Sequence, residues 1–296
     1  MTTTTLPRTA RRSAQLLAAS ERMTLDPFTH VDWDVPVDDS AFHLPPEWLP
    51  LYGTATWDTM DAEARVAYSR HECAALCGAG IWFENRLMQL VLRHLADLPV
   101  TAPEHRYLLV EVADECRHST MFGEYIRRAG TPAYSPSVGV GLLDQLQEVP
   151  GHRALGYVLI LAVEELLDAA NRAMMKDERV HPVARQIAKL HVLEEARHVS
   201  FAKTYLAEVW PELADDERAG VKGRAPTAVK VVADLTVDPD VYSTLGIEDG
   251  EATARANPHH RARVVEGLAK LTAFLAELGV IDDETAPEWR ELGLLA

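Results

Sequence analysis

The feature that most constrains this chain is a spaced pattern of glutamates and histidines that occurs twice. Glu84 precedes a Glu-x-x-His motif at 115–118, and Glu164 precedes a second such motif at 195–198 with identical spacing. Every member of the second set follows its mate in the first at one constant offset along the chain. The matched spacing predicts one pair of helices used twice, with each pair presenting a lone Glu and a Glu-x-x-His to a shared interior.

Helical periodicity dominates the middle of the chain. Apolar residues predict four long helices, over 58–97, 103–129, 152–177 and 182–209, separated by breaks that contain Pro or Gly. Thr101 is expected to cap the second of them. Strand alternation is almost absent, so we predict an all-α fold with a ferritin-like four-helix bundle as its core.

The two ends of the chain differ from this core. Residues 1–57 are rich in Pro, Asp and Thr, which favours an extended N-terminal arm lying on the core at 58–210. Residues 211–296 are less regular, and they predict additional C-terminal helices near 226–236 and 258–279 that close one side of the bundle. We interpret the whole chain as a single domain.

The repeated polar residues lie on helix faces that are otherwise apolar. In the helix expected at 182–209, His191, Glu195 and His198 share a stripe that has Ile187 among its apolar neighbours. They therefore point into the core. A buried carboxylate without a partner is too costly to keep ionised, so we expect cations between the helices.

Charge arithmetic favours two metal ions. Four glutamates carry four negative charges, two divalent ions carry four positive ones, and neutral imidazoles add nothing, so the filled site is neutral. Mixed oxygen and imidazole ligands are typical of iron or manganese, whereas a structural zinc site favours thiolates and fewer carboxylates. The candidate metal ligands are Glu84, Glu115, His118, Glu164, His191, Glu195 and His198.

Several neighbouring residues are assigned other roles. Asp114 and Glu194 each precede a ligand glutamate, and we expect them to accept the second imidazole N–H of a histidine across the bundle; an ordinary interhelical or surface charge is the alternative. The alternative for His191 is a hydrogen-bonded core histidine. Its repeat mate, Glu111, is either an outer partner of the site or solvated. Glu165 points roughly 100° away from Glu164 around the helix and is not taken as a ligand.

A third Glu-x-x-His, at 178–181, tests how specific the motif is. It lies at a helix boundary just before Pro182 and has no partner glutamate at the right distance. We therefore assign it to a loop. The other two motifs differ from it in their shared spacing and their apolar surroundings.

Composition excludes several classes of partner. The formal net charge is −16 at pH 7, so nucleic acid and anionic membrane surfaces would repel the chain. No segment approaches the ~20 apolar residues that a membrane span requires. The N-terminal apolar run is broken at Gln15 and is too short for a signal sequence. Three cysteines without CxxC spacing favour a reducing compartment, and we expect the cytoplasm.

With this ligand set assembled, the sequence resembles the p-aminobenzoate N-oxygenase (AurF-like) family of non-haem di-iron oxygenases. The most specific feature is His191, one turn before the second Glu-x-x-His, because many other di-iron carboxylate families lack it. The matching stretches, between about residues 30 and 210, are LYGTATWDTM, GAGIWFENRL, VADECRHSTMFG, LAVEELLD and HVLEEARH.

The resemblance implies a specific chemistry. In that family the corresponding residues bind two iron ions, which activate dioxygen and oxidise an amine nitrogen, often of an aromatic biosynthetic substrate, through hydroxylamine towards nitro. Homodimers are usual there. No Rossmann or flavin-binding fingerprint is visible, so electrons are expected from a separate reductase or small carrier. The sequence singles out no basic residue for a substrate carboxylate, so the substrate-binding residues stay unassigned.

Three other functions use related ligand sets. Ribonucleotide reductase small subunits place a radical Tyr four residues after the first histidine, where this chain has Phe122. Acyl-carrier desaturases share the D-E-x-R-H and E-E-x-R-H pairs but lack a counterpart of His191, and their acidic carrier would meet an acidic partner. They remain the alternative, together with carbon hydroxylation. Ferritin-like iron storage is the non-enzymatic alternative, although ferritin chains lack a C-terminal region as long as 211–296.

Overall fold

The computed structural model describes residues 6–36, 38, 40–136 and 149–295. Within these residues the regular structure is helical, and the one β contact is an isolated bridge between Phe42 and Val180. The prediction of an all-α fold is confirmed.

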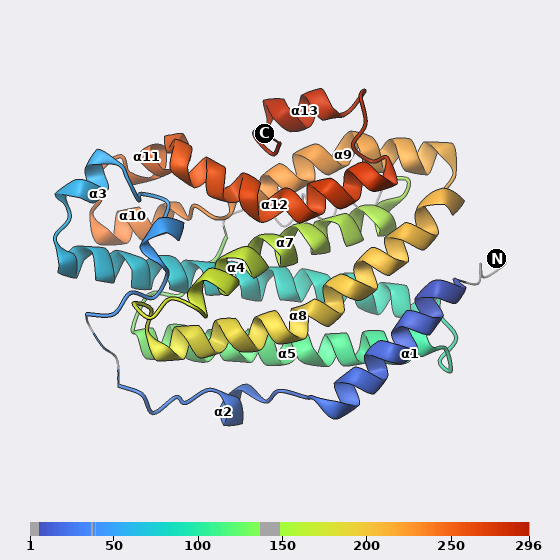
Figure 1. The fold of residues 1–296 in the computed structure, drawn as a ribbon, viewed down its shortest axis with the longest axis horizontal. Helices are drawn as coiled ribbons and strands as arrows, with labels where there is room; N and C mark the ends of the chain where they lie inside the picture. Colours follow the sequence, from blue (N-terminus) through green and yellow to red (C-terminus); the bar gives the residue numbers. More distant parts are fainter. Residues whose placement is uncertain (1–5, 37, 39, 137–148, 296) are drawn as a thin grey trace.

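Four long helices form the core of the molecule (Figure 1). They are α4 (Ala62–Ala96), α5 (Pro103–Ala129), α7 (His152–Met174) and α8 (Pro182–Val209). The closest pairs are α4 with α5 and α7 with α8, and these two pairs also contact each other through α4 with α7 and α5 with α8. The helix pair that the repeated spacing predicts is therefore used twice, in a ferritin-like bundle.

The helix starts depart from the prediction in two places. Helix α4 begins at Ala62 because the side chain of Asp61 accepts a hydrogen bond from the backbone N–H of Ala64, at 2.8 Å. The preceding residues form a separate short helix, α3 (Ala55–Thr59). Thr101 does not cap α5, since the cap position is Ala102 and no side chain bonds there.

The N-terminal segment is not extended at its start, so that part of the prediction is wrong. Residues Pro7–Arg22 form a helix, α1, that packs against α5 and α8. No side chain of α1's own N-terminus caps it. Instead, the carboxylate of Glu208 on α8 accepts hydrogen bonds from the backbone N–H groups of Arg8 (2.8 Å) and Thr9 (2.6 Å). Beyond α1 come the short helices α2 (Pro27–His30) and η1 (Pro46–Trp48).

The C-terminal region is more helical than predicted. After the short helix η2 (Trp210–Glu212), helix α9 runs over Asp215–Asp234 and continues through Pro226, where the sequence pattern suggested a start. Burial of Val221 and Val229 in the core that α9 shares with α7 offsets the hydrogen bond that proline removes. The remaining helices are α10 (Pro239–Leu245), α11 (Gly250–Ala256), α12 (Pro258–Leu278) and α13 (Ala286–Glu291).

Helices α9 and α12 both pack on α7, so the C-terminal region covers one side of the bundle (Figure 1). The turn into α7 depends on Gly151, whose φ of 75° is in the left-handed region. A Cβ at this position would also lie 2.7 Å from the backbone oxygen of Glu217 on α9. Glycine therefore allows α9 to approach the start of α7 closely.

Two apolar clusters fill the bundle and leave a polar layer between them. On α4, Cys77 belongs to one cluster and Leu87 to the other, with the buried Glu84 between them. On α8, Leu190 and Phe201 belong to different clusters in the same way. The candidate metal ligands occupy this layer.

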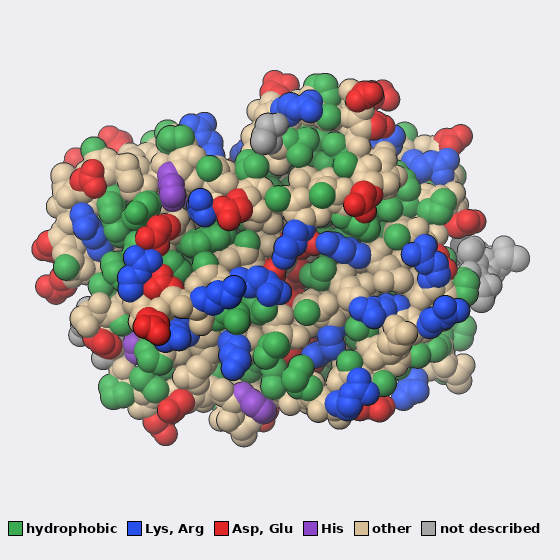
Figure 2. All heavy atoms as spheres, in the orientation of Figure 1, with side chains coloured by type: hydrophobic (Ala, Val, Ile, Leu, Met, Phe, Trp, Pro, Cys, Tyr) green, Lys and Arg blue, Asp and Glu red, His purple; other side chains and the backbone are tan. Residues whose placement is uncertain are grey.

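The surface carries both signs of charge. Figure 2 shows basic and acidic side chains mixed on one face, with lysines and arginines forming a band across its middle. The formal net charge of −16 is therefore not concentrated on that face. Among the described residues, no helix has the length and the apolar character that crossing a bilayer requires.

Candidate metal centre

All seven candidate ligands meet in the interior of the four-helix core. Each is at most 2% exposed. Every core helix contributes to the group. The two Glu-x-x-His motifs and the two lone glutamates lie at the same level along the bundle. Helix α4 carries Glu84, α5 carries Glu115 and His118, α7 carries Glu164, and α8 carries His191, Glu195 and His198.

The two Glu-x-x-His motifs face each other across the bundle. Nδ1 of His118 lies 2.8 Å from Oε2 of Glu115 and 3.0 Å from Oε1 of Glu195. Nδ1 of His198 lies 2.9 Å from each of the same two carboxylates. Glu115 and Glu195 therefore form the middle of the centre, each shared by both imidazole rings.

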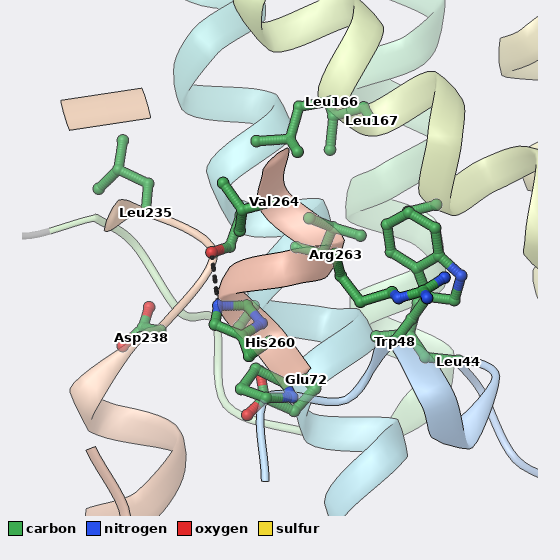
Figure 3. A pocket seen from close by; sticks show the side chains of 15 residues that line it. Leu44, Trp48, Glu72, Leu166, Leu167, Leu235, Asp238, His260, Arg263 and Val264 are labelled. Atoms are coloured by element: carbon green, nitrogen blue, oxygen red, sulfur yellow. Dashed lines mark hydrogen bonds between the residues drawn. The ribbon is translucent and has the colours of Figure 1, made fainter. Parts of the chain in front are cut away.

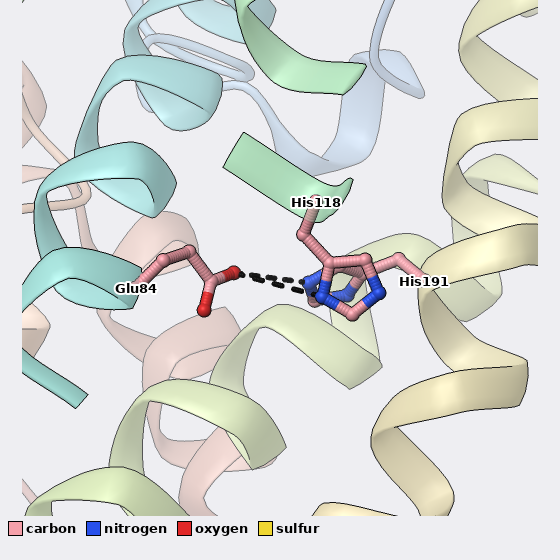
Figure 4. A group of neighbouring side chains, drawn as sticks. All are labelled: Glu84, His118 and His191. Atoms are coloured by element: carbon pink, nitrogen blue, oxygen red, sulfur yellow. Dashed lines mark ion pairs between the residues drawn. The ribbon is translucent and has the colours of Figure 1, made fainter. Parts of the chain in front are cut away.

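The lone glutamates and His191 lie around this middle. Nε2 of His191 is 3.7 Å from Oε1 of Glu84 and 3.7 Å from Oε1 of Glu195. Figure 4 shows His118 and His191 side by side, both turned towards the carboxylate of Glu84. Glu164 approaches His191 and Glu195 from α7. Each lone glutamate thus faces a histidine at the edge of the centre.

The unpaired atoms of these side chains fit a cation. Oε2 of Glu84, Oε2 of Glu164 and Nε2 of His191 are buried without a hydrogen-bond partner in the described part of the chain. Such atoms are costly unless a ligand binds them. Three groups of residues bring their ligating atoms together, and within each group these atoms lie within 4.8 Å of one another. The groups are Glu84, His118 and His191; Glu115, Glu195 and His198; and Glu164, His191 and Glu195.

The carboxylates differ in pKa because each is buried beside the charges of the others and beside different histidines. Burial raises the pKa of Glu84 well above its usual range, and the charge of Glu115 raises it further. Burial and the charge of Glu195 do the same for the pKa of Glu164. Burial and the charge of Glu195 also oppose ionisation of Glu115, but contacts with His198 and His118 prevail and hold its pKa at about 2.

The pKa values of the three histidines shift in different directions. Burial disfavours their charged forms, yet the surrounding carboxylates raise the pKa values of His118 and His198 well above the ordinary value. Burial lowers the pKa of His191 to about 4. The directions of these shifts favour protons on Glu84, Glu164 and the two motif histidines, which lowers the net charge of the layer. Cations bound here would displace those protons.

Asp114 and Glu194 contact the outer nitrogens of the two motif histidines. With Nδ1 turned to the centre, Nε2 of His118 faces Oε2 of Glu194 at 3.0 Å. Nε2 of His198 faces Oδ2 of Asp114 at 3.3 Å. Both contacts cross between α5 and α8. Each carboxylate can accept the Nε2–H and so fix the tautomer that leaves Nδ1 free to bind a metal.

Two arginines that the sequence interpretation left without a role neutralise these outer carboxylates. Nη2 of Arg197 lies 3.2 Å from Asp114 and 3.3 Å from Glu194. Arg117 forms an ion pair with Asp114 and lies 3.8 Å from Glu194. The two arginines are separated by the same offset as the repeated ligands. The repeat spacing was therefore a signal for them.

His191 is supported differently from the other two histidines. Its Nδ1 lies 3.2 Å from the side-chain amide of Asn171, a buried residue on α7. An amide can turn its oxygen to this nitrogen and accept its proton, which leaves Nε2 free for a metal. The ring of Phe122 lies against His191, with centroids 5.3 Å apart. No repeat spacing marks Asn171, so the sequence pattern contains no signal for it.

The other glutamates near the centre, and the third Glu-x-x-His, do not join the groups of ligating atoms. Glu111 is 1% exposed and so is not solvated; burial raises its pKa to about 8, and it does not join a group of ligating atoms. Glu165 forms an ion pair with Lys203. His181, from the third Glu-x-x-His, begins α8 as its cap and accepts a hydrogen bond from Val183, as expected of a boundary residue.

A helical bundle with a buried layer of glutamates and histidines defines the class of ferritin-like metal-site proteins. Within this class the chain belongs to the AurF family: the family model described as "P-aminobenzoate N-oxygenase AurF" matches residues 7–279. The match covers most of the chain, including the C-terminal helices on α7. The resemblance that the motifs indicated is therefore confirmed.

Similar proteins occur in mycobacteria. "Uncharacterized protein Mb0909" of Mycobacterium bovis is 26% identical over 234 residues, which are 76% of this chain and 68% of the relative. "Uncharacterized protein Rv0885" of Mycobacterium tuberculosis matches to the same extent. The names of these relatives state neither an activity nor a substrate.

Proposed function

We propose that this protein is an O₂-dependent di-iron monooxygenase that oxidises the amine nitrogen of a small, aromatic, biosynthetic substrate. The observation that supports the proposal most directly is the layer of seven buried ligating side chains in a member of the AurF family. Glu84, Glu115, His118, Glu164, His191, Glu195 and His198 would hold two iron ions. When bound, these ions supply the activation of dioxygen.

In the first oxidation, an amine R–NH₂, O₂, two electrons and two protons give the hydroxylamine R–NHOH and water. Further cycles give nitroso and nitro products. The electrons come from a separate reductase or small carrier, and a homodimer is the proposed assembly.

The chain's own residues provide the surroundings that such chemistry needs. Burial of the whole layer excludes bulk water. With metal bound, Glu194 and Asp114 would accept the Nε2 protons of His118 and His198, so that each ring presents an unprotonated Nδ1 to the centre. Asn171 can do the same for His191.

The test is anaerobic loading with ferrous iron, followed by exposure to oxygen and mass spectrometry across a panel of arylamines, alkyl amines and acyl thioesters. Hydroxylamine, nitroso or nitro products support the proposal. An alkene would indicate desaturation, a carbon-bound hydroxyl would indicate hydroxylation, and ferric mineral without organic product would indicate iron storage. Any of these three results alone contradicts N-oxygenation.

Two adjacent glutamates provide a matched test of the ligand assignment. Glu164→Ala removes a proposed ligand and should lower the bound iron, whereas Glu165→Ala removes the partner of Lys203 and should leave it unchanged. Metal analysis of the purified variants measures both. Equal iron content in the two variants would show that Glu164 is not a ligand.

A further inference from the structure

Two cavities lie next to each other between the metal centre and the C-terminal helices. The inner cavity, of about 20 Å³, is lined by residues that include Phe122 and Asn171. The outer cavity, of about 60 Å³, is lined by residues of α4, α7 and α12 and of the segment around Trp48 (Figure 3). Leu76 and Leu167 line both cavities. The two cavities are therefore adjacent and share these leucines as a wall; together they outline a path towards the metal centre.

The inner end of this path is lined by two residues that contact histidines of the metal centre. Phe122 lies against the rings of His118 and His191, and Asn171 contacts Nδ1 of His191. The other side chains of the inner cavity are mainly apolar, among them Leu76 and the small residues of α4 and α8. A molecule in this path would approach the centre from the side of His191.

The outer cavity contains a carboxyl group that the metal centre does not use. Glu72 is 4% exposed, and its Oε1 has no hydrogen-bond partner among the described residues. Burial raises its pKa to about 8, although contacts with the hydroxyls of Tyr68 and Tyr242 oppose this rise. A buried polar atom that faces a cavity without a partner indicates a missing ligand.

Most other polar atoms of the outer cavity have partners, although Nε of Arg263 is also buried without one among the described residues. Nη1 of Arg263 lies 2.7 Å from Oε2 of Glu266 on the same helix. His260 Nε2 pairs with the hydroxyl of Thr236 at 3.1 Å. Asp238 caps α10 and accepts the backbone N–H of Asp240. Arg263 is already paired with a carboxylate through Nη1, so Glu72 is the buried carboxyl group of the cavity without an ion-pair partner among the described residues.

Glu72 also sets a length. It precedes Glu84 on α4 by just over three helical turns, which is about 18 Å along the helix axis. The recognised group and the metal centre are therefore several helical turns apart along α4. p-Aminobenzoate is shorter than this, and its carboxylate would face a carboxyl group.

We propose that the outer cavity binds the far end of an elongated amine substrate, through a primary amino group that pairs with Glu72. The nitrogen to be oxidised lies at the other end, near His191, and a slender linker passes Leu76 and Leu167. This inference rests on the proposed function and deepens it, because it names the substrate class. A basic amine takes the proton of the Glu72 carboxyl, so both partners are charged when bound.

The test compares two probes of the same shape and opposite end groups, 4-(4-aminophenyl)butan-1-amine and 4-(4-aminophenyl)butanoate, by calorimetry in the absence of oxygen. The purified protein is used with the metal it carries. The diamine should bind more tightly than the carboxylate. Glu72→Gln should weaken diamine binding about tenfold or more, because a charge-assisted hydrogen bond is lost. Glu63→Gln, an exposed position on the same helix, should change nothing.

A second variant makes the test independent of Glu72 itself. Ala170 lines the outer cavity and is 7% exposed. Ala170→Leu should fill the cavity and weaken diamine binding while Glu72 is intact. Unfolding curves and metal content check that both variants are folded.

Three results would overturn the inference: tighter binding of the carboxylate probe with loss on Arg263→Gln, unchanged diamine binding in Glu72→Gln, or no binding of either probe. The proposed function fails separately. If the protein holds no iron but diamine binding depends on Glu72, only the oxygenase proposal is wrong. If amines are oxidised without any effect of Glu72, only the substrate class is wrong.

Discussion

The imidazoles of His118 and His198 turn the same nitrogen, Nδ1, towards the centre, and this fixes what Nε2 must do. A ring that gives its Nδ1 lone pair to a metal carries its proton on Nε2. Glu194 and Asp114 lie where they can accept those protons. The register of each acidic residue, one position before a candidate ligand glutamate, was the sequence signal for these positions, with an ordinary interhelical or surface charge as the alternative.

Replacing Glu194 should weaken metal binding. Glu194→Ala removes the partner of His118 Nε2 and should reduce affinity for ferrous iron roughly 10-fold to 100-fold, the usual effect of losing such a partner. Glu194→Gln keeps an acceptor oxygen and should lose less. Anaerobic titration with a competing chelator measures both. Unchanged affinity in Glu194→Ala would show that this contact has no role in binding.

His94 predicts a pH dependence of stability. It is buried beside the hydroxyl of Tyr157, at 2.7 Å, and burial lowers its pKa from 6.5 to about 3. Between these values the unfolded chain binds a proton that the folded chain does not, so the folded state is favoured above pH 6.5 and loses stability as the pH falls towards 3.

This contribution can be isolated with His94→Gln, which cannot be protonated. Between neutral pH and about pH 5, the wild type should lose about 2 kcal/mol more of its unfolding free energy than the variant. Urea denaturation at the two pH values measures this. His152→Gln, at an exposed position, is the control and should behave as wild type. Parallel losses in all three proteins would remove His94 as the cause.

At the scale of helices, the sequence predicted those elements whose signals are local. Helices α5 and α8 begin at the residues that the sequence predicted, because a proline at each start and an unbroken apolar periodicity mark them. Helix α1 was missed because the group that caps it, Glu208, lies far away along the chain. The helix predicted near 226–236 was shorter than α9 because Pro226 suggests a helix start, which tertiary packing overrides.

The candidate site follows the same rule. The seven candidate ligands have fixed separations along their helices. Their convergence could therefore be predicted from the spacing of the two repeated motifs. Asn171 and Glu72 could not, because each matters through a contact or cavity that forms only when distant helices pack. Nothing in the local sequence distinguishes them from other buried polar residues.

Helix α1 provides a prediction at this scale. Glu208→Ala leaves two backbone N–H groups at the start of α1 without their acceptor and should lower the free energy of unfolding by about 1–2 kcal/mol. Hydrogen exchange should increase over Pro7–Arg22. Glu212→Ala, at an exposed position nearby, should have little effect. Equal effects of the two changes would mean that the Glu208 contact does not hold α1.

For the whole molecule, metal binding should stabilise the folded chain. Bound at a free concentration about 100 times its dissociation constant, a metal ion adds about 2.7 kcal/mol to the free energy of unfolding. Chelation should therefore lower Tm, and ferrous iron should restore it. Calorimetry of both forms measures the difference.

The effect of Glu84→Gln on stability should depend on whether metal is bound. Without metal, the variant should be at least as stable as wild type, because burial and the charge of Glu115 oppose ionisation of Glu84. With metal, it should be less stable, because a ligand is missing. A variant that is less stable in both forms would indicate a structural role for Glu84 rather than metal binding.

The two halves of the bundle agree in register at every ligand position but differ at one place, where His191 corresponds to Glu111. His191 joins the ligating atoms, whereas Glu111 does not. The two proposed ion positions would therefore be chemically unequal, and we expect them to fill in sequence rather than together. The two sides of the centre also differ in their surroundings. Within the described residues, the side beside His191 adjoins the inner cavity, so under the proposed function reactants would approach from that side.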